Sequence, residues 1–372
     1  MTIGLLNLYS TRNLGDAAIY SALTAMAPNH RTSGVLNEVN GTAVPGLTFL
    51  PRLPDCQAYV SVGGEIFNNA RRYLVTKRFL ANVGELSWYA PKTMLFGQSI
   101  PESCQGPAFA MLALALRRLP AVVVRDERSH RQLRAAGVAA ELSYDSAFAL
   151  RPAPMDIAAA ARLFDRLGLD PARTAVVSLR GHSPMYAESG KSTAHGLIAL
   201  SRRLMARGHR VALVLQADND ICDSDRSLCK QIVEELPGVA VMDPFEEPAE
   251  VPPYALLMGV LALANVVVAV RYHSAILRLV AGRQAFVLHY SNKGKDLAQR
   301  LGLPGLPLSA AGDDNAVAFA ERSAEGVFDA APLTRDVREH FEGGLDRIGK
   351  RGPAAAALER SPRSRAQTTV TG

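Results

Sequence analysis

The chain has 372 residues, of which 48% are hydrophobic, 20% charged and 6% aromatic. This length predicts two domains that can each bury a core, and the composition excludes collagen-like, coiled-coil and wholly disordered proteins. The net charge is +6, but residues 350–372 hold five basic residues against one acidic residue, so the remainder is nearly neutral and nucleic-acid binding has weak support.

Short β-rich runs alternate with helical sequence in the first half of the chain. Each expected strand is followed by a loop and then by a helical stretch, the first of which starts at about Asp16. This repeat predicts parallel strands with helices on both faces of a sheet. The expected strands cover residues 3–8, 58–62, 93–96 and 121–124.

The same repeat resumes after a proline-containing break at residues 151–154. We expect strands at 174–179, 210–215, 239–242, 266–270 and 284–288 and helices at 193–207, 225–236, 255–264 and 295–301. The sequence therefore predicts an α/β fold in three parts. These are an N-terminal α/β domain over 1–150, a C-terminal α/β domain over 151–335, and a terminal helix with a disordered basic tail over 336–372.

The sequence carries no signal for export or membrane insertion. The longest apolar run, residues 254–270, is shorter than the ~20 residues of a membrane span and divides into the helix and strand expected there. The N-terminus lacks the basic region of a signal peptide. Because the four cysteines have no zinc-binding spacing, and no His, Asp or Glu cluster has a metal-ligand spacing, we expect a cytoplasmic protein with reduced thiols and no metal site.

Three candidate ligand contacts follow strands of the first half. Gly15 and Asp16 lie between the first strand and its helix, where free N–H groups and the positive end of a helix suit an anionic or hydroxyl-rich ligand. Gly63 and Gly64 permit close approach of the backbone to a ligand. Arg125 lies where a buried strand ends at the expected cleft. Read locally, the same patterns are also typical of a helix cap, a tight turn and a surface ion pair.

Three cations and a histidine follow strands of the second half. Arg180 and Arg271 each end a predicted strand, Lys293 follows the strand sequence AFVLHY, and His273 lies two residues beyond Arg271. Because ligands of open parallel sheets bind at the carboxyl ends of strands, we expect these side chains to face one cleft. Two arginine forks suit a ligand with a phosphate and a carboxylate, and a histidine can serve as general acid or base.

An ordered set of seven motifs resembles the polysaccharide pyruvyl transferase family between about Ile3 and Leu303. The motifs are NLGDAAI, SVGGEIFNN, LFGQSI, VVRDERSHRQLRAAGV with DSAFAL, VVSLR, NVVVAVRYHSAI and YSNKGKDLAQRLGL. The sequence departs from the family's usual residues at Ala17, Asn265 and Tyr272. These departures bear mostly on the acceptor sugar and leave the donor residues unchanged.

The resemblance implies two Rossmann-like domains in a GT-B-like arrangement, with a cleft between them. It implies transfer of a pyruvyl group from phosphoenolpyruvate to a sugar of an exopolysaccharide or cell-surface glycan precursor, with a cyclic ketal formed and phosphate released. Phosphoenolpyruvate would be a co-substrate on the C-terminal side, the acceptor would meet the N-terminal side, and no cofactor is implied.

Carried over residue by residue, the resemblance makes Arg180, Arg271 and Lys293 contacts of phosphoenolpyruvate, and places Gly15 and Asp16 in the family's N-terminal GD motif. His273 in its acid form would protonate the methylene carbon of the enol ether. We expect Asp16, on the opposite side of the cleft, to orient or deprotonate the attacking hydroxyl.

Two other interpretations stay open. A GT-B glycosyltransferase with a nucleotide-sugar donor needs an acidic residue for the ribose hydroxyls, which Asp243 or Glu246-Glu247 could supply. A non-catalytic protein of the same fold would have no reason to keep the three cations and the histidine together. If the acceptor is lipid-linked, the basic tail would add at most a weak peripheral contact with an anionic membrane.

Overall fold

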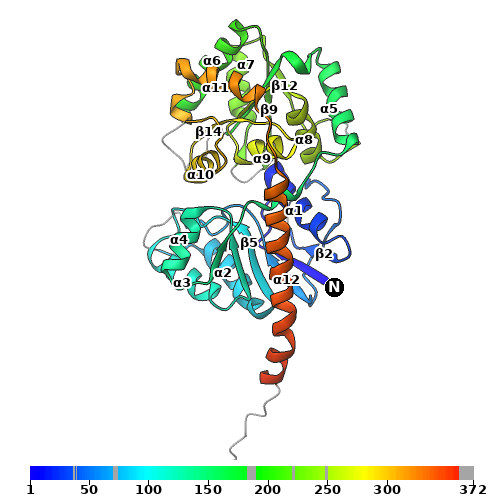
Figure 1. The fold of residues 1–372 in the computed structure, drawn as a ribbon, viewed down its shortest axis with the longest axis vertical. Helices are drawn as coiled ribbons and strands as arrows, with labels where there is room; N and C mark the ends of the chain where they lie inside the picture. Colours follow the sequence, from blue (N-terminus) through cyan, green and yellow to red (C-terminus); the bar gives the residue numbers. More distant parts are fainter. Residues whose placement is uncertain are drawn as a thin grey trace, which may run out of the picture.

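Two parallel β-sheets, one after the other in the chain, form the framework of the protein (Figure 1). The computed structural model describes residues 1–36, 38, 40–69, 74–181, 190–219, 223–247 and 250–359. The basic tail predicted at the C-terminus lies mostly outside these residues. The predicted fold class, α/β with two Rossmann-like units in a GT-B-like arrangement, is confirmed.

The N-terminal sheet has seven strands in the order β3-β2-β1-β4-β5-β6-β7, and every neighbouring pair is parallel. This is the Rossmann strand order, in which the chain reverses direction across the sheet between β1 and β4, with one further strand at the edge. The strands are β1 (Thr2–Leu6), β2 (Arg31–Gly34), β3 (Leu47–Phe49), β4 (Ala58–Ser61), β5 (Thr93–Gln98), β6 (Ala121–Val124) and β7 (Ala140–Leu142).

The C-terminal sheet repeats this topology with six parallel strands in the order β12-β9-β8-β13-β14-β15. The apolar run at 254–270 divides as predicted, into the buried helix α8 (Pro253–Leu263) and the strand β13. No helix in the described part of the chain is long and apolar enough to cross a bilayer. The strands are β8 (Thr174–Ser178), β9 (Arg210–Val214), β12 (Ala240–Met242), β13 (Val266–Ala269), β14 (Phe286–His289) and β15 (Gly305–Pro307).

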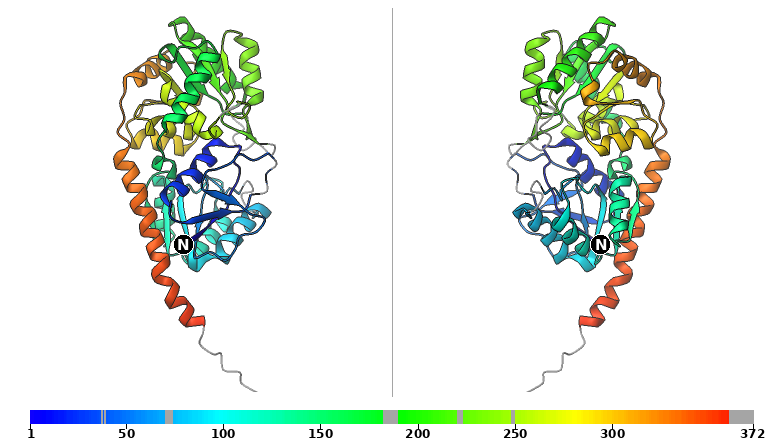
Figure 2. Two further views of the ribbon diagram at one scale, coloured as in Figure 1. Left: turned by 90° about the vertical axis from the view of Figure 1, so that its right-hand side faces the viewer. Right: turned by 90° about the vertical axis from the view of Figure 1, so that its left-hand side faces the viewer.

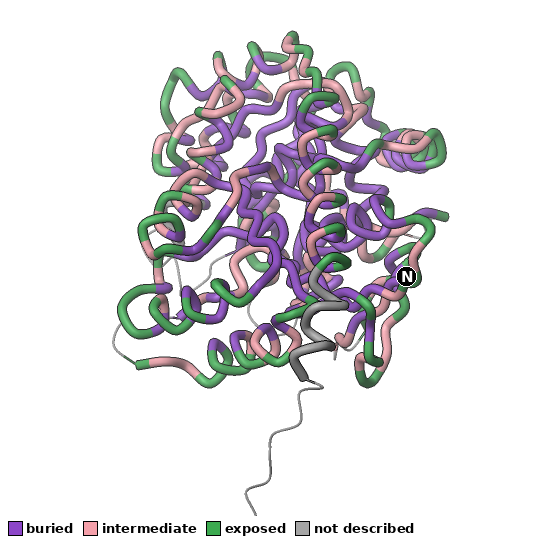
Figure 3. The backbone as a smooth tube through the Cα atoms, turned by 60° about the horizontal axis from the view of Figure 1, so that its bottom comes forward, coloured by how far each residue is buried: buried purple, intermediate pink, exposed green. Residues whose placement is uncertain are grey.

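Helices cover both faces of each sheet, so the strands are buried and the exposed positions lie on the outer helices and loops (Figure 3). One face of the N-terminal sheet packs against α2 (Lys77–Trp88), α3 (Gly106–Leu116) and α4 (Glu127–Ala135), and the other against α1 (Leu14–Met26) and α12 (Ala331–Glu359). The C-terminal sheet packs on one face against α6 (Gly190–Ala206), α7 (Arg226–Glu235) and α11 (Asp314–Glu325). Its other face packs against α5 (Pro154–Arg166), α8, α9 (Tyr272–Val280) and α10 (Asn292–Arg300).

The two sheets are held together by a continuous apolar cluster in which α1 packs against α8 and α9. A hydrogen bond of 2.6 Å between the hydroxyls of Ser21 and Tyr254 crosses this contact. Helix α12 follows the C-terminal sheet in the chain but runs along the N-terminal sheet (Figure 2). There Phe341 packs edge-on against Phe96, with ring centroids 5.3 Å apart.

Two details of the sequence analysis need correction. Helix α1 begins at Leu14 rather than at about Asp16, and Asn13 is its N-cap, since the Asn13 side chain accepts the N–H of Gly15 at 3.2 Å. The strands β2, β3, β7 and β15, and the short antiparallel pair β10 (Asp218–Asn219) and β11 (Asp223–Ser224), were not predicted, because they are at most four residues long and lack a run of apolar residues.

Candidate functional site

A cavity of about 190 Å³ lies between the two sheets, at the carboxyl ends of their strands. One side is lined by the loops after β4, β5 and β6, and the other by the loop after β14 and the start of α10. The lining includes Glu65, Ser99, Tyr290 and Lys293. This position is the one at which open α/β sheets bind their ligands.

An ion pair across the cavity joins the two sides: Lys293 Nζ lies 2.8 Å from Glu65 Oε2. Burial alone would raise the pKa of the Glu65 carboxyl, but Lys293, Arg125 and Arg180 lower it to about 2. Cations from both sheets therefore converge on one carboxylate.

Arg125 follows β6 and is buried together with Asp145, its ion-pair partner; neither side chain is exposed to solvent. Arg125 Nε also donates to Ser99 Oγ at 2.8 Å, and the guanidinium lies 4.8 Å from the centre of the Tyr272 ring. Burial would raise the pKa of the Asp145 carboxyl, but His273 and Arg125 hold it well below its usual range. The pair is therefore ionised, with each charge compensated by the other.

His273, in the first turn of α9, lies between Asp145 and Gly15. Its Nε2 is 3.4 Å from Asp145 Oδ2, and its Nδ1 faces α1, where a Cβ added to Gly15 would lie only 2.2 Å away. Burial lowers the pKa of His273 below its usual range; Asp145 opposes the shift, while Arg125 and Lys293 add to it. These protein groups together favour the neutral imidazole.

Two buried nitrogens beside Asp145 are weakly satisfied: Arg125 Nη2 has no hydrogen-bond partner within the residues that the structure describes, and His273 Nε2 has only its 3.4 Å contact with the Asp145 carboxylate. Buried polar atoms are nearly always hydrogen-bonded, so an exception calls for an explanation. Since both atoms lie next to the cation cluster, they are candidates for ligand contacts.

Arg180 and Lys293 are positioned by tyrosine rings. The Arg180 guanidinium lies 4.4 Å from the centre of the Tyr290 ring, and Lys293 Nζ lies 5.9 Å from that of Tyr272. The negative face of an aromatic ring stabilises a cation placed over it. Tyr272, which also contacts Arg125, thus links cations of the two sheets.

Arg271 is engaged differently from the other predicted cations. Its Nη2 lies 2.6 Å from Asp225 Oδ1, and its Nε donates to the carbonyl of Leu179 at 2.8 Å. Asp225 also accepts the backbone N–H groups of Gly181, Gln216 and Ala217. These contacts tie the ends of β8, β9 and β13 together, and contact of Arg271 with a substrate stays a prediction.

The glycines and Asp16 form the N-terminal side of the site. A Cβ added to Gly64 would lie 3.4 Å from Arg125 Nη2 and 3.9 Å from Asp16 Oδ1, so these three residues are neighbours. Gly63 has a φ of +113°, which residues with a side chain rarely adopt, and is therefore required by the turn itself.

Sequence reasoning missed three residues of the site, Glu65, Asp145 and Tyr290. Each lies inside or directly beside a motif that the sequence displays: Glu65 in SVGGEIFNN, Asp145 at the start of DSAFAL, and Tyr290 at the start of YSNKGK. The signal was therefore present, but the partners of these side chains lie far away in the chain.

Replacing Gly15 by alanine should lower turnover about 10²-fold, because the added Cβ must displace the imidazole of His273. The melting temperature should also fall, because moving a buried imidazole out of its packed position costs about 1–3 kcal/mol, so turnover is compared per amount of folded protein. The matched control is Gly343→Ala in α12, where a Cβ meets no atom within 4 Å. Equal steady-state activity of both variants would show that His273 is not confined by Gly15.

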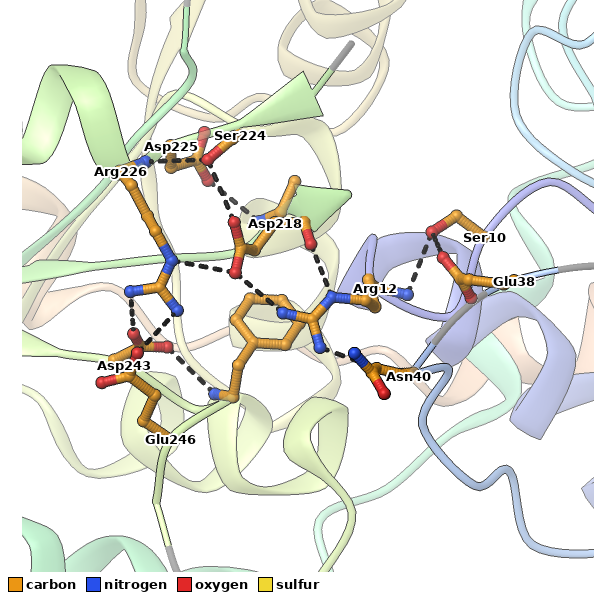
Figure 4. A network of polar contacts seen from close by, with 12 residues as sticks. Ser10, Arg12, Glu38, Asn40, Asp218, Ser224, Asp225, Arg226, Asp243 and Glu246 are labelled. Atoms are coloured by element: carbon orange, nitrogen blue, oxygen red, sulfur yellow. Dashed lines mark hydrogen bonds and ion pairs between the residues drawn. The ribbon is translucent and has the colours of Figure 1, made fainter. Parts of the chain in front are cut away.

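Two of the acidic residues considered for a nucleotide ribose, Asp243 and Glu246, belong to a network of ion pairs (Figure 4). Arg226 lies 2.7 Å from Asp243 Oδ2 and 3.1 Å from Glu246 Oε1, and it also pairs with Asp218, at 2.8 Å. Asp218 in turn binds Arg12, from the loop before α1, at 2.8 Å. Glu247 is paired with Arg166. Asp218 joins the two sides of the molecule through Arg12, whereas Asp243, Glu246 and Glu247 pair with arginines of the C-terminal half.

The comparisons with known proteins give a family and a fold. A model of the polysaccharide pyruvyl transferase family matches residues 13–292. S. aureus MnaA, solved with UDP, is similar in structure, with TM-score 0.59 and 11% identity over 94% of this chain and 98% of that one. The UDP-GlcNAc 2-epimerase of Methanocaldococcus jannaschii has TM-score 0.56 and 9% identity, over 91% and 99%. No curated protein matches the sequence. At these identities the structural likeness shows the fold alone.

Proposed function

The chain belongs to the polysaccharide pyruvyl transferase family, and we propose that it transfers a pyruvyl group from phosphoenolpyruvate to a sugar of an exopolysaccharide or cell-surface glycan precursor. The products would be a cyclic pyruvate ketal and phosphate. The reaction would take place in the cytoplasm, where phosphoenolpyruvate is made.

The observation that carries this proposal is the cationic surrounding of the Glu65 carboxylate beside His273: Lys293 contacts it at 2.8 Å, and Arg125 and Arg180 help to lower its pKa. A cluster that holds a buried carboxylate ionised also suits the phosphate and carboxylate of phosphoenolpyruvate. In the proposed complex Lys293 exchanges Glu65 for the ligand. Arg125 Nη2, which has no partner within the described part of the chain, gains one.

The chemistry begins with protonation of the enol phosphate. His273 gives a proton to the methylene carbon, which becomes a methyl group, and the adjacent carbon becomes an electrophile stabilised by its oxygen. A sugar hydroxyl adds to that carbon and loses its proton to Asp16. A second hydroxyl of the same sugar then displaces phosphate, which leaves with the electron pair of the broken C–O bond and takes up the proton of that hydroxyl. Arg180, Arg271 and Lys293 stabilise the leaving phosphate.

The charge of the ligand also explains how His273, which is neutral in the protein alone, can become protonated. Burial, with Arg125 and Lys293, keeps the pKa of His273 low in the protein alone. An anionic ligand that neutralises these two cations removes part of this effect and adds an attraction for the imidazolium. Binding of phosphoenolpyruvate should therefore protonate the histidine that the reaction needs as an acid.

A second candidate, a glycosyltransferase with a nucleotide-sugar donor, is favoured by the likeness in fold to a protein solved with UDP. It is weakened by the ion pairs of Asp243, Glu246 and Glu247, which leave these carboxylates engaged by arginines. A nucleotide ribose would have to compete with those partners.

The test is phosphate release from phosphoenolpyruvate in the presence of galactosides, glucosides and N-acetylhexosamines, each offered alone. We expect sugar-dependent release with one acceptor class and a product heavier than the sugar by one pyruvyl ketal in mass spectrometry. Thermal stabilisation by nucleoside diphosphates but not by phosphoenolpyruvate would instead support the nucleotide-sugar interpretation and reject the proposal.

A further inference from the structure

The outer face of α2 and α3 carries more exposed apolar side chains than a surface in contact with water normally does. Half of the large exposed apolar side chains in the described part of the chain lie on these two adjacent helices. They are Leu80, Trp88, Met111 and Leu114, and Trp88 is 80% exposed. We call these four residues the α2–α3 face. Exposed apolar side chains gathered on two adjacent helices are a candidate site of interaction.

Helix α3 shows the pattern most clearly. It contains no charged residue, and its exposed positions are Gly106, Pro107, Ala110, Met111 and Leu114. In an ordinary surface helix these solvent-facing positions would be polar. The buried side of α3 is also apolar and packs on the sheet, so the fold of the helix does not need an apolar outer face.

The exposed charges on α2 and directly after α3 are cationic, and Glu102, the exposed carboxylate four residues before α3, belongs to the lining of the cavity. Lys77 and Arg78 begin α2, Arg117 and Arg118 follow the last turn of α3, and all four are exposed. Glu85 is the one carboxylate in the two helices, and it turns inward to accept the N–H and the side-chain amide of Asn7 at 3.0 and 2.8 Å. Burial accordingly raises the pKa of the Glu85 carboxyl.

We propose that the α2–α3 face docks on an anionic lipid bilayer, with Trp88 and Leu114 entering the headgroup region and the flanking cations meeting lipid phosphates. An exposed apolar strip with a tryptophan and a cationic border is the composition that interfacial helices use. A symmetric dimer through the same face would bring like cations together with no exposed carboxylate on either helix to offset them.

The location of the α2–α3 face would bring the cavity close to the membrane on docking. As crossover helices of a parallel sheet, α2 and α3 both begin at its carboxyl edge, and Pro101, Glu102 and Ser103, just before α3, line the cavity. A protein docked on α2 and α3 would hold the rim of the cavity close to the bilayer. A sugar carried on a membrane lipid could then enter from the side. This last step alone rests on the proposed function.

The chain provides its own probe, since Trp88 is its single tryptophan. With vesicles of equimolar phosphatidylglycerol and phosphatidylcholine, we expect its emission to shift to shorter wavelength and to be quenched by lipids brominated in the acyl chain. Vesicles of phosphatidylcholine alone should give a smaller effect, and added salt should weaken the anionic binding. Unchanged emission with the anionic vesicles would refute the docking without any variant.

Two double variants of the full chain test the apolar and the electrostatic contributions to membrane binding separately. Met111→Gln/Leu114→Gln and Lys77→Glu/Arg118→Glu should each reduce co-sedimentation with the anionic vesicles about tenfold. The matched control is Met155→Gln on α5, which is 59% exposed and far from the face in sequence, and it should bind like the unmodified chain. All variants keep residues 350–372, so full binding by both double variants would assign the attraction to the tail and overturn the proposal.

Two further readouts separate the remaining outcomes. Phosphate release with a water-soluble acceptor should be unaffected in both double variants, so loss of vesicle binding cannot be confused with loss of the reaction. Light scattering across a range of protein concentrations tests the alternative that the α2–α3 face binds a second copy of the chain. A dimer that Met111→Gln/Leu114→Gln abolishes, without any effect of vesicles, would assign the face to a second copy of the chain.

Discussion

Replacing His273 by alanine should lower kcat for pyruvyl transfer about 10²–10⁴-fold, the range found for removal of a general acid. Phosphoenolpyruvate should still bind, because Arg125, Arg180 and Lys293 remain. The expected result is therefore a loss in turnover without a matching loss in donor affinity. Phosphate release measures the first quantity and thermal shift with phosphoenolpyruvate the second.

The pH dependence gives this prediction a second readout. If the acid form of His273 is required, kcat/KM for phosphoenolpyruvate falls as the pH rises through the pKa of His273 in the free protein. Burial lowers this pKa, so the decline should be centred below the usual range for histidine. In kcat, which reports the complex, the decline should move to higher pH, because the anionic ligand stabilises the imidazolium.

The matched control is His209→Ala. His209 belongs to the same half of the chain but comes just before β9, at the end of the strand opposite the cavity, where its ring lies near Glu321. This variant should keep the activity and the pH profile of the unmodified chain. Equal activity of the two alanine variants would remove His273 from the mechanism.

Replacing Asp145 by alanine should destabilise the protein by about 3–5 kcal/mol, the cost of leaving one partner of a buried ion pair uncompensated. Arg125 would remain fully enclosed without its counter-charge, and the N–H of Ala147, now bound to Asp145 at 2.8 Å, would lose its acceptor. Urea unfolding measures the difference. In contrast, Glu127→Ala breaks an exposed pair with Arg131 and should cost less than about 1 kcal/mol.

The loss of stability in Asp145→Ala should depend on pH, because the pKa of Asp145 is lowered in the folded protein. Because His273 and Arg125 hold the pKa of Asp145 well below its usual range, its contribution is present at neutral pH and is lost only as the pH falls below that range. The stability difference between the unmodified chain and Asp145→Ala should therefore shrink on acidification. A difference under about 1 kcal/mol at neutral pH would mean that the pair is not desolvated.

Asp145→Asn separates a positioning role from a purely structural one. Asp145 raises the pKa of His273 against the effect of burial, so its loss should move the decline of kcat/KM to still lower pH. A stability defect alone would lower the amount of active protein without moving the profile.

The sequence by itself determined the framework. Runs such as Ala121–Val124 and Val266–Ala269 are consistently apolar and bounded by loops, so the strands and the parallel α/β class follow from local pattern. The same reasoning placed Arg125, Arg180 and Arg271 just after strands, because the position of a residue that closely follows a buried strand is set by the strand, and it placed Lys293 beyond the last of the predicted strands, where the structure has the first turn of α10. The motifs in their order led to the family.

Only the tertiary structure decided which of these side chains meet. Arg271 pairs with Asp225, whereas Lys293 pairs with Glu65, 228 positions away in the chain. Nothing in the local sequence distinguishes these two cations. Likewise, Gly15 is read locally as a turn residue, and its role in making room for His273 exists only because α1 packs on α9. Local pattern fixes backbone conformation, but charge compensation, burial and pKa depend on neighbours that only the packing of the two sheets supplies.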